Sequence, residues 1–169
     1  MSLIKPVKGI LPKFGDNCWC AENSTIVGDV TMGDNCTVWF NAVIRGDVNS
    51  IIIGNNSNIQ DGAIIHCTYQ KTKTTIGNYV SIAHNAIVHG CTIEDNVLIG
   101  MGAIIMDGAI IETGSIIAAG AIITQNTRVS AGTIYAGNPA KLLKEVSPEA
   151  SEVFMRTANN YVMYSEWFK

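Results

Sequence analysis

The three histidines have the clearest capacity for chemistry in this chain, and all of them fall between positions 66 and 89. Neutral imidazole is a common zinc ligand, at a metal–nitrogen distance of about 2.0–2.1 Å, and three such ligands leave one tetrahedral position open for catalysis. His66, His84 and His89 are therefore candidate metal ligands. The competing interpretation is a set of solvated or hydrogen-bonded histidines without a metal. Because no histidine lies outside this short stretch, we favour the metal site.

A repeat of six residues must position these histidines. Three extra residues precede Ile53, a longer insertion precedes Ile76 and one residue is dropped before Ile93. The fifth position of each hexad is mostly small, and positions two to four are rich in Gly, Asp and Asn, which turn the chain. The hexads, 20 in number, open with Phe14, Cys20, Ile26, Met32, Val38, Ile44, Ile53, Ile59, Ile65, Ile76, Ile82, Val88, Ile93, Ile99, Ile105, Ile111, Ile117, Ile123, Val129 and Tyr135.

The period of six predicts an all-β protein, a parallel β-helix. Six residues match no face of an α-helix, and the turns recur too often for a sandwich of hairpins. Each hexad indicates a short strand and a corner, so three hexads form one coil of a triangular prism. Coils stack about 4.8 Å apart, and the hexads suffice for between six and seven coils. Hydrophobic residues make up 47% of the chain and aromatic residues 7%, which indicates an aliphatic interior.

The repeat resembles that of the bacterial hexapeptide-repeat transferase family over about residues 14–138. The resemblance, and not the period, implies a left-handed coil and a homotrimer. We expect residues 1–13 to form a lead-in that caps the first coil, because a bare coil end would expose an unpaired strand edge. Residues 1–138 are thus predicted to form a hexapeptide-repeat left-handed β-helix with an N-terminal lead-in.

The tail breaks the repeat. The segment 137–141 predicts an exit from the coil, and Ser147-Pro148-Glu149 has the cap, proline and acid typical of a helix start. Residues 139–169 are expected to form an exit loop and a C-terminal α-helix packed on the prism. The expected buried face of that helix consists of Ala150, Phe154, Ala158, Tyr161, Ser165 and Phe168.

Counting hexads predicts which residues stack on one another. Arg45, His66 and His89 each hold position two, three hexads apart, so they should form one file on one face. His84 holds position three of an earlier hexad and should point around the corner, away from the other two histidines of its own chain. In a three-fold trimer, His84 of one subunit could reach His66 and His89 of another. We therefore expect the metal sites at the subunit interfaces.

A narrower resemblance is carried by Arg45-Gly46-Asp47, Asn58-Ile59-Gln60-Asp61, His66 and the segment from His84 to Gly90, which together resemble the γ-class carbonic anhydrases. The resemblance implies Zn²⁺, with Fe²⁺ or Co²⁺ as alternatives, bound by two histidines of one chain and one of its neighbour. It implies that Arg45 and Asp47 hold the interface and line the site, and that Asn58 and Gln60 orient metal-bound water and substrate. Tyr161 matches a tyrosine that the family brings from its C-terminal helix. The stacking rule predicts that Gln60 lies one coil from His84, on the same face.

Plainer roles for these residues stay open. Arg45 and Asp47 could form a structural ion pair, Asn58 could be a corner residue only, and Tyr161 could simply pack. Asp61 holds a position where Asp is ordinary, so we favour a structural role for it. Cys67 should face opposite to His66 along its strand and is not counted as a ligand.

The predicted function is that of a γ-class carbonic anhydrase-like zinc protein that hydrates CO₂ reversibly to bicarbonate through zinc-bound hydroxide. The insertion from Cys67 to Thr75 has two lysines and lacks the proton-carrying glutamate of the most active relatives, so activity is expected to be weak. One alternative is an acyltransferase or acetyltransferase that uses acyl-CoA and needs a metal-free histidine as general base. Another is a non-catalytic metal-bound trimer that serves as a scaffold.

Charge and cysteine content constrain partners and compartment. The net charge of −3 gives no reason to expect nucleic acid or an acidic membrane surface as partner. No run of 18 apolar residues and no secretory signal are seen, so we expect a cytoplasmic protein. The five cysteines form no C-x-x-C pair and are expected to be free thiols.

Overall fold

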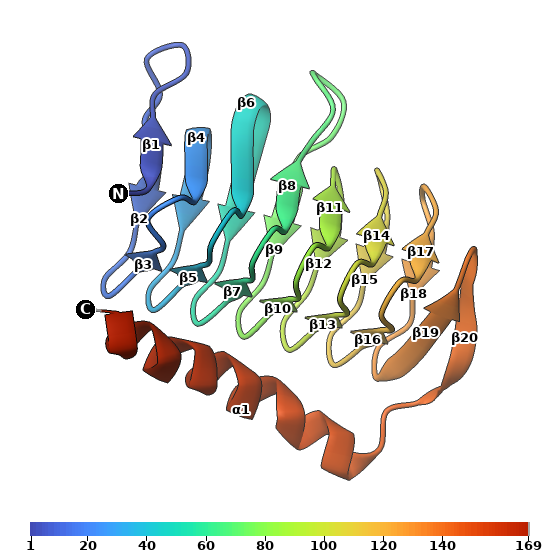
Figure 1. The fold of residues 1–169 in the computed structure, drawn as a ribbon. Helices are drawn as coiled ribbons and strands as arrows, with labels where there is room; N and C mark the ends of the chain where they lie inside the picture. Colours follow the sequence, from blue (N-terminus) through green and yellow to red (C-terminus); the bar gives the residue numbers. More distant parts are fainter. Residues whose placement is uncertain (169) are drawn as a thin grey trace.

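A computed structural model describes residues 1–168, except for the side chain of Ser151. Lys169, the last residue of the expected C-terminal segment, lies outside the described residues. The chain winds into a stack of coils whose strands are flanked on one side by a single long helix (Figure 1). Within residues 1–168, no helix is long and apolar enough to cross a membrane.

Two faces of the prism merge into one 12-stranded sheet, because β4 and β6 each continue around a corner. The first of these faces carries β1 (Leu3–Lys5), β4 (Thr25–Met32), β6 (Val43–Ile53), β8 (Ile64–His66), β11 (Ile87–His89), β14 (Ile104–Ile105) and β17 (Ile122–Ile123). The second carries the far halves of β4 and β6 with β2 (Lys13–Phe14), β9 (Thr74–Ile76), β12 (Thr92–Ile93), β15 (Ile110–Ile111) and β18 (Arg128–Val129).

The third face is an 8-stranded sheet in the order β20-β19-β16-β13-β10-β7-β5-β3. All of its neighbouring strands are parallel except β19 and β20, which are antiparallel. Its members are β3 (Trp19–Cys20), β5 (Thr37–Val38), β7 (Asn58–Ile59), β10 (Ser81–Ile82), β13 (Leu98–Ile99), β16 (Ile116–Ile117), β19 (Thr133–Gly137) and β20 (Ala140–Glu145). The predicted hexads therefore correspond to individual strands, and the prediction that residues three hexads apart stack on one another is confirmed.

The core consists of three vertical files of first-position residues, one file per face. Isoleucines at these positions, from Ile26 to Ile123, are at most 2% exposed. Burying one such side chain contributes about 1.5–3 kcal/mol to stability. The corners are turned by left-handed residues, which are often asparagine because its short polar side chain tolerates positive φ. These asparagines, with φ between 53° and 60°, are Asn17, Asn35, Asn41, Asn56, Asn85, Asn96 and Asn126.

Both ends of the chain contribute more regular structure than the sequence predicted. The lead-in adds β1, which pairs in parallel with β4 and covers the edge of the first coil. The expected exit loop after residue 138 is instead β20, which folds back antiparallel on β19. The exit-loop prediction was therefore wrong for residues 140–145, because the segment can satisfy its backbone hydrogen bonds on the last coil.

The helix α1 (Pro148–Ser165) begins as expected, with the Ser147 hydroxyl accepting a hydrogen bond from the amide of Ala150 at 3.3 Å. It runs along the outside of the third face, where it contacts β5 and β10 (Figure 1). Phe154, Ala158 and Ser165 are buried, and Ala150 and Tyr161 are half-buried. Phe168 lies beyond α1, in the short 3-10 helix η1 (Glu166–Phe168), and is 54% exposed. Its ring still packs on the prism, 5.5 Å from those of Trp19 and Phe40 between centroids.

Candidate metal centre

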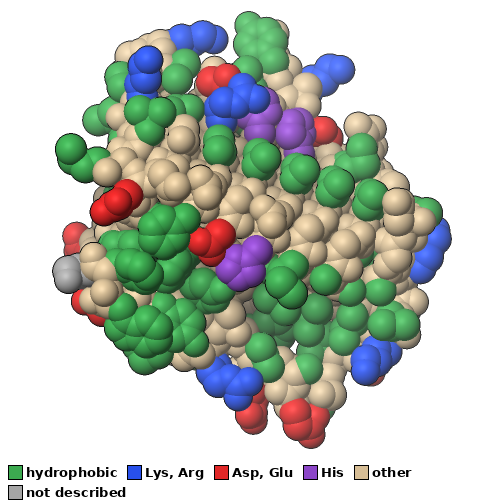
Figure 2. Space-filling view, in the orientation of Figure 1, with side chains coloured by type: hydrophobic (Ala, Val, Ile, Leu, Met, Phe, Trp, Pro, Cys, Tyr) green, Lys and Arg blue, Asp and Glu red, His purple; other side chains and the backbone are tan. Residues whose placement is uncertain are grey.

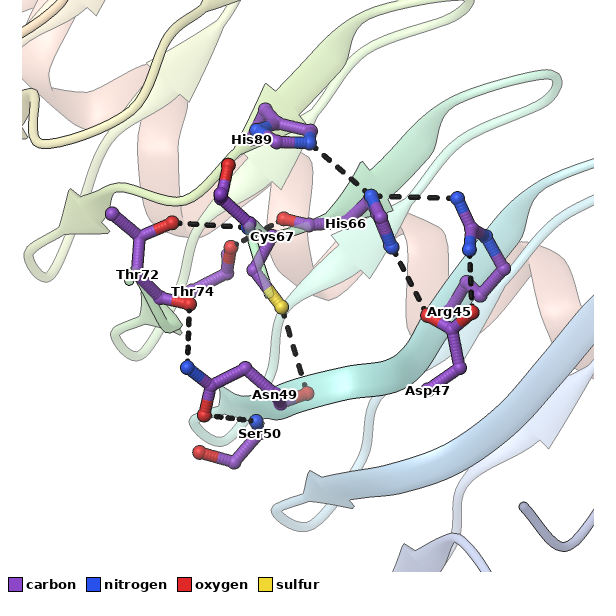
Figure 3. Close-up of polar contacts among 10 residues, drawn as sticks. Arg45, Asp47, Asn49, Ser50, His66, Cys67, Thr72, Thr74 and His89 are labelled. Carbon is purple, nitrogen blue, oxygen red and sulfur yellow. Dashed lines mark hydrogen bonds and ion pairs between the residues drawn. The ribbon is translucent and has the colours of Figure 1, made fainter. Parts of the chain in front are cut away.

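His66 and His89 lie side by side on neighbouring strands, as the hexad count predicts. They are register partners at the ends of β8 and β11. The two imidazoles face one another across 3.2 Å between Nδ1 of His66 and Nε2 of His89 (Figure 3). Two nitrogens bound to one tetrahedral zinc at about 2.0–2.1 Å lie about 3.3–3.4 Å apart. The pair is thus already spaced to serve as two ligands of one ion.

The outer nitrogen of His89 is held by Asp107. Its Nδ1 lies 3.0 Å from Oδ2 of Asp107, whose other oxygen accepts hydrogen bonds from Thr68 (2.9 Å) and Thr72 (2.7 Å). Burial opposes ionisation, but the two hydroxyls and His89 keep the pKa of Asp107 below its usual value. Gly90 permits this approach, since a Cβ there would lie 2.1 Å from the Asp107 oxygen. A carboxylate on Nδ1 leaves Nε2 free to bind a metal, as in many zinc sites.

The outer nitrogen of His66 is held by Asp47, at 3.0 Å from Nε2 to Oδ1. Arg45 bonds the other oxygen of Asp47 at 2.5 Å and lies 3.4 Å from Nδ1 of His66 (Figure 3). Burial lowers the pKa of His66 despite the opposing effect of Asp47, which favours the neutral form that binds metals. The bonds from Arg45 and His66 outweigh partial burial and lower the pKa of Asp47. Arg45 and Asp47 are therefore an ion pair that also adjoins the histidines.

His84 belongs to a different cluster. It lies in the turn after β10, and its Nδ1 is 3.0 Å from Oδ2 of Asp61. In Figure 2, two histidine side chains touch and the third lies apart from them, next to an acidic and a hydrophobic surface. Within the described part of one chain, no group of three or more His, Cys, Asp or Glu is arranged to hold a metal ion. One chain supplies only two of the three expected ligands to one place.

The stacking partner of His84 is Asp61, which corrects the expectation for Gln60. Ile59 and Ile82 are register partners, so Gln60 lies opposite Ala83 and Asp61 lies opposite His84. The expectation was off by one residue because Gln60 holds position two of its hexad and His84 holds position three. The structural role favoured for Asp61 is also incomplete, since its carboxylate pairs with a candidate ligand.

Asn58 and Gln60 form a buried amide pair on the third face, which α1 covers. They are 1% and 4% exposed, and Gln60 donates to the side-chain oxygen of Asn58 at 2.9 Å. Asn58 in turn donates to the hydroxyl of Ser81 at 2.9 Å. Among the residues described, neither amide is hydrogen-bonded to a histidine. Their predicted role toward water and substrate stays a prediction.

Tyr161 lies beside His84, on the wall of an aromatic cavity of about 340 Å³ that also includes Asp61. Its ring packs edge-on against Trp39 at 5.2 Å between centroids. Burial, and then the nearby Asp61 carboxylate, raise the pKa of Tyr161 to about 12. The remaining lining residues are aromatic, namely Phe40, Tyr164, Trp167 and Phe168. The packing role and the site role considered for Tyr161 are therefore compatible.

Sequence reasoning missed Asp107 and the two threonines that bind it. A signal did exist, since Val88 and Ile105 are register partners, so Asp107 directly follows Met106, the residue one coil after His89. It was weak because Asp is common at its hexad position. The loop between β8 and β9 brings Thr68 and Thr72 to this carboxylate. Cys67 behaves as expected, because it is fully buried and its thiol lies 3.5 Å from the Asn49 carbonyl (Figure 3).

Comparisons with known proteins agree with this architecture. A family model described as Bacterial transferase hexapeptide (six repeats) matches residues 12–46 and 90–125. A Methanocaldococcus jannaschii protein named probable carbonic anhydrase is 49% identical over 150 residues, which cover 89% of this chain and 94% of the relative. Gamma carbonic anhydrase 2, mitochondrial, of Arabidopsis thaliana is 36% identical over 156 residues, covering 89% of this chain and 56% of the relative.

The fold is also found among solved structures. A hexapeptide transferase family protein from Anaplasma phagocytophilum superimposes with a TM-score of 0.94 at 37% identity, covering 99% of this chain and 98% of that one. This agreement extends over the coils and the C-terminal helix together. The fold prediction of a hexapeptide-repeat β-helix with a C-terminal α-helix is thereby confirmed.

Proposed function

This chain belongs to the γ-class carbonic anhydrase-like proteins of the hexapeptide-repeat family, and from that premise we propose that it binds zinc and hydrates CO₂ reversibly. The observation that carries the proposal is the His66–His89 pair, whose inner nitrogens are 3.2 Å apart while carboxylates hold both outer nitrogens. Relatives named carbonic anhydrase support the same reaction class.

The donor set fits zinc. His66 and His89 of one subunit and His84 of the partner subunit would provide three imidazoles and leave one position for substrate. Zinc held there supplies the Lewis acidity that lets water ionise near neutral pH, and carbonic anhydrase is itself the standard example of that effect. The same imidazole set also suits Fe²⁺ or Co²⁺.

A homotrimer is the assembly that would complete each site. Beside the Arg45–His66–His89 file runs a stripe of outward-facing aliphatic side chains, none of them fully buried in one chain (Figure 2). The stripe consists of Val43, Ile64, Ile87, Ile104 and Ile122. A contiguous exposed apolar surface of this kind marks an interaction site. A partner packed on the stripe would lie directly beside the two paired histidines.

The other residues have roles that follow from their positions. Arg45 has a half-exposed side chain next to His66 and is suited to hold the bicarbonate anion. Gln60, supported by Asn58, would orient water and substrate from the side of the interface that carries His84. Tyr161 borders His84 and would shape the entrance. Asp47 and Asp107 would fix the orientations of the two paired imidazoles.

Metal analysis together with a CO₂ assay tests the function. Purified protein is expected to contain one zinc per chain and to hydrate CO₂ in stopped-flow measurements. Chelator treatment should abolish the rate, and added zinc should restore it. His89→Ala is the matched loss-of-site variant. Full zinc occupancy without CO₂ hydration would contradict the enzyme proposal and support a metal-bound scaffold instead.

An acyltransferase is the second candidate, and one observation favours it. The His84–Asp61 pair resembles a histidine base oriented by a carboxylate, and it opens on the aromatic cavity beside Tyr161. Calorimetric titration with acetyl-CoA distinguishes the two functions. We expect no binding to the zinc-loaded protein, and micromolar binding accompanied by acetyl transfer would favour the acyltransferase.

We place the protein in the cytoplasm. Its five cysteines are all free within the described residues, which fits a reducing compartment. Fractionation of the source cells with an antibody against the protein checks this, and recovery from an oxidising compartment would contradict it.

A further inference from the structure

Two cysteines lie one above the other at the N-terminal end of the prism. Trp19 and Thr37 are register partners in β3 and β5, and the Trp19 amide donates to the Cys36 carbonyl at 2.9 Å. The preceding residues, Cys18 and Cys36, therefore stack with a Cα separation of about 4.8 Å, the spacing of adjacent strands. That separation lies within the range of about 4.4–6.8 Å found across disulfides.

Packing does not require sulfur at these two positions. Each thiol donates to a glycine carbonyl of the following coil, at 3.0 Å from Cys18 and 2.9 Å from Cys36. Ser57 occupies the same position one coil further on and makes the same contact at 2.9 Å. Serine thus satisfies the site's steric and hydrogen-bonding needs, and what the cysteines add is their reactivity.

The two thiols differ in access and in acidity. Cys18 is half-buried and lines an open cavity of about 470 Å³ at the end of the prism, whereas Cys36 is fully buried beneath it. The neighbouring Cys36 thiol, which can donate to a Cys18 thiolate, lowers the pKa of Cys18 to about 7. The neighbouring Cys18 sulfur, followed by burial, raises the pKa of Cys36. Cys18 is therefore the thiol that presents a thiolate to small solutes.

We propose that Cys18 and Cys36 form a peroxide-sensitive thiol pair, in which Cys18 is oxidised first and Cys36 then closes an intramolecular disulfide. This inference does not depend on the zinc site. The ligand class is a small hydroperoxide, because the cavity reaches Cys18 but leaves Cys36 covered.

The reaction balances in two steps. The Cys18 thiolate attacks one peroxide oxygen, so an S–O bond forms, the O–O bond breaks, and the leaving hydroxide takes a proton to become water. Sulfur is oxidised to sulfenic acid and the peroxide is reduced. The Cys36 sulfur then attacks the Cys18 sulfur, so the S–S bond forms and the S–O bond breaks. A second water leaves with the proton from Cys36, and a dithiol reductant reverses the change.

Intact-mass and peptide analysis of the full-length protein tests the proposal. Reduced protein is treated with hydrogen peroxide, and the remaining thiols are blocked with iodoacetamide. The expected product has lost two hydrogens per chain and carries a reducible link between the peptides that contain Cys18 and Cys36. Cys36→Ser should form no link and should accumulate a dimedone-reactive sulfenic acid at Cys18. Cys18→Ser should give neither product.

Cys91→Ser is the matched control, because Cys91 is 2% exposed and distant in sequence from the pair. It should form the link like the wild type. A link to Cys20, or overoxidation of Cys18 without any link in the wild type, would overturn the proposal. The presence or absence of the link in the wild type tests the proposal even if a variant fails to fold. Circular dichroism checks that each serine variant is folded.

Discussion

At the scale of single residues, the candidate metal centre depends on the partner of each imidazole's outer nitrogen, because that partner determines what the inner nitrogen can bind. Asp107 accepts from Nδ1 of His89, and Asp47 lies on the outer nitrogen of His66. Each carboxylate is itself held, by Thr68 and Thr72 in one case and by Arg45 in the other. Such support fixes the ring orientation before a metal arrives.

Asp107→Asn should therefore weaken zinc binding by about 10–100-fold, because the amide holds the His89 ring less firmly. Competition with a chelating dye measures this without reference to activity. Asp95→Asn is the matched control, since Asp95 has the same hexad position but its carboxylate bonds Asn78 and no histidine among the described residues. Equal zinc affinity in both variants would show that Asp107 does not support the site.

At the scale of secondary-structure elements, the segments of interest are the corners of the prism and the loop between β8 and β9. Most corners contain a residue with a left-handed backbone, and asparagine fills many of these positions. The loop is the one insertion that reaches the histidine pair in the described residues, through Thr68 and Thr72. Corner residues therefore contribute to stability, and this loop supports the histidine pair through Asp107.

Asn96→Ala should lower the free energy of unfolding by about 1–2 kcal/mol, because alanine is strained at the φ of 56° that Asn96 adopts. Asn96→Gly should stay close to wild type, since glycine accepts that angle. Denaturant unfolding at a fixed protein concentration measures both variants. Equal losses in the two would point to the asparagine side chain and not to the backbone.

Proton transfer should limit CO₂ hydration, because the loop from Cys67 to Thr75 contains no carboxylate. The ammonium groups of Lys71 and Lys73 have no free lone pair to accept a proton. Concentrated imidazole buffer should raise kcat and leave kcat/KM nearly unchanged, since a carrier works best with a pKa near the working pH. Tyr69→Glu should do the same in dilute buffer, and Tyr69→Gln is its uncharged control. A stopped-flow rate that ignores buffer concentration would show that another group already moves the proton.

The scale of the whole molecule concerns what one chain leaves incomplete. His84 lies on another face from the histidine pair, and an aliphatic stripe runs beside that pair. Both features are explained together if three copies pack around a common axis, each copy presenting His84 to its neighbour's pair. The unit that binds zinc would then be the interface and not the chain.

Sedimentation should accordingly give a mass near three times the 18.1 kDa of one chain. His84→Ala should lose as much zinc as His66→Ala, because each removes one of three ligands. Mixing the two variants during refolding should restore roughly a quarter of the sites, those where an intact pair meets an intact His84. Metal analysis of the mixed trimers reads this out. No restoration, or a monomer that keeps zinc, would contradict the shared site.

The sequence alone determined the fold and the file of Arg45, His66 and His89. A period of six, with its three interruptions counted, assigns three strands to each coil, so residue spacing translates directly into spatial register. The same counting placed His84 away from the pair. These inferences needed only the local periodicity, which can be read from a single sequence.

Only the tertiary structure decided which other side chains contact these histidines and what covers the third face. Asp107 reaches His89, the Asp61 carboxylate pairs with His84, and α1 lies over the face that carries Asn58 and Gln60. Residues 140–145 extend the sheet as β20, where the sequence predicted a loop. Such contacts depend on how the loop, the tail and the helix pack against the prism. The hexad pattern specifies the strands, but it does not specify which side chains from separate segments meet, because those contacts form only when the segments pack.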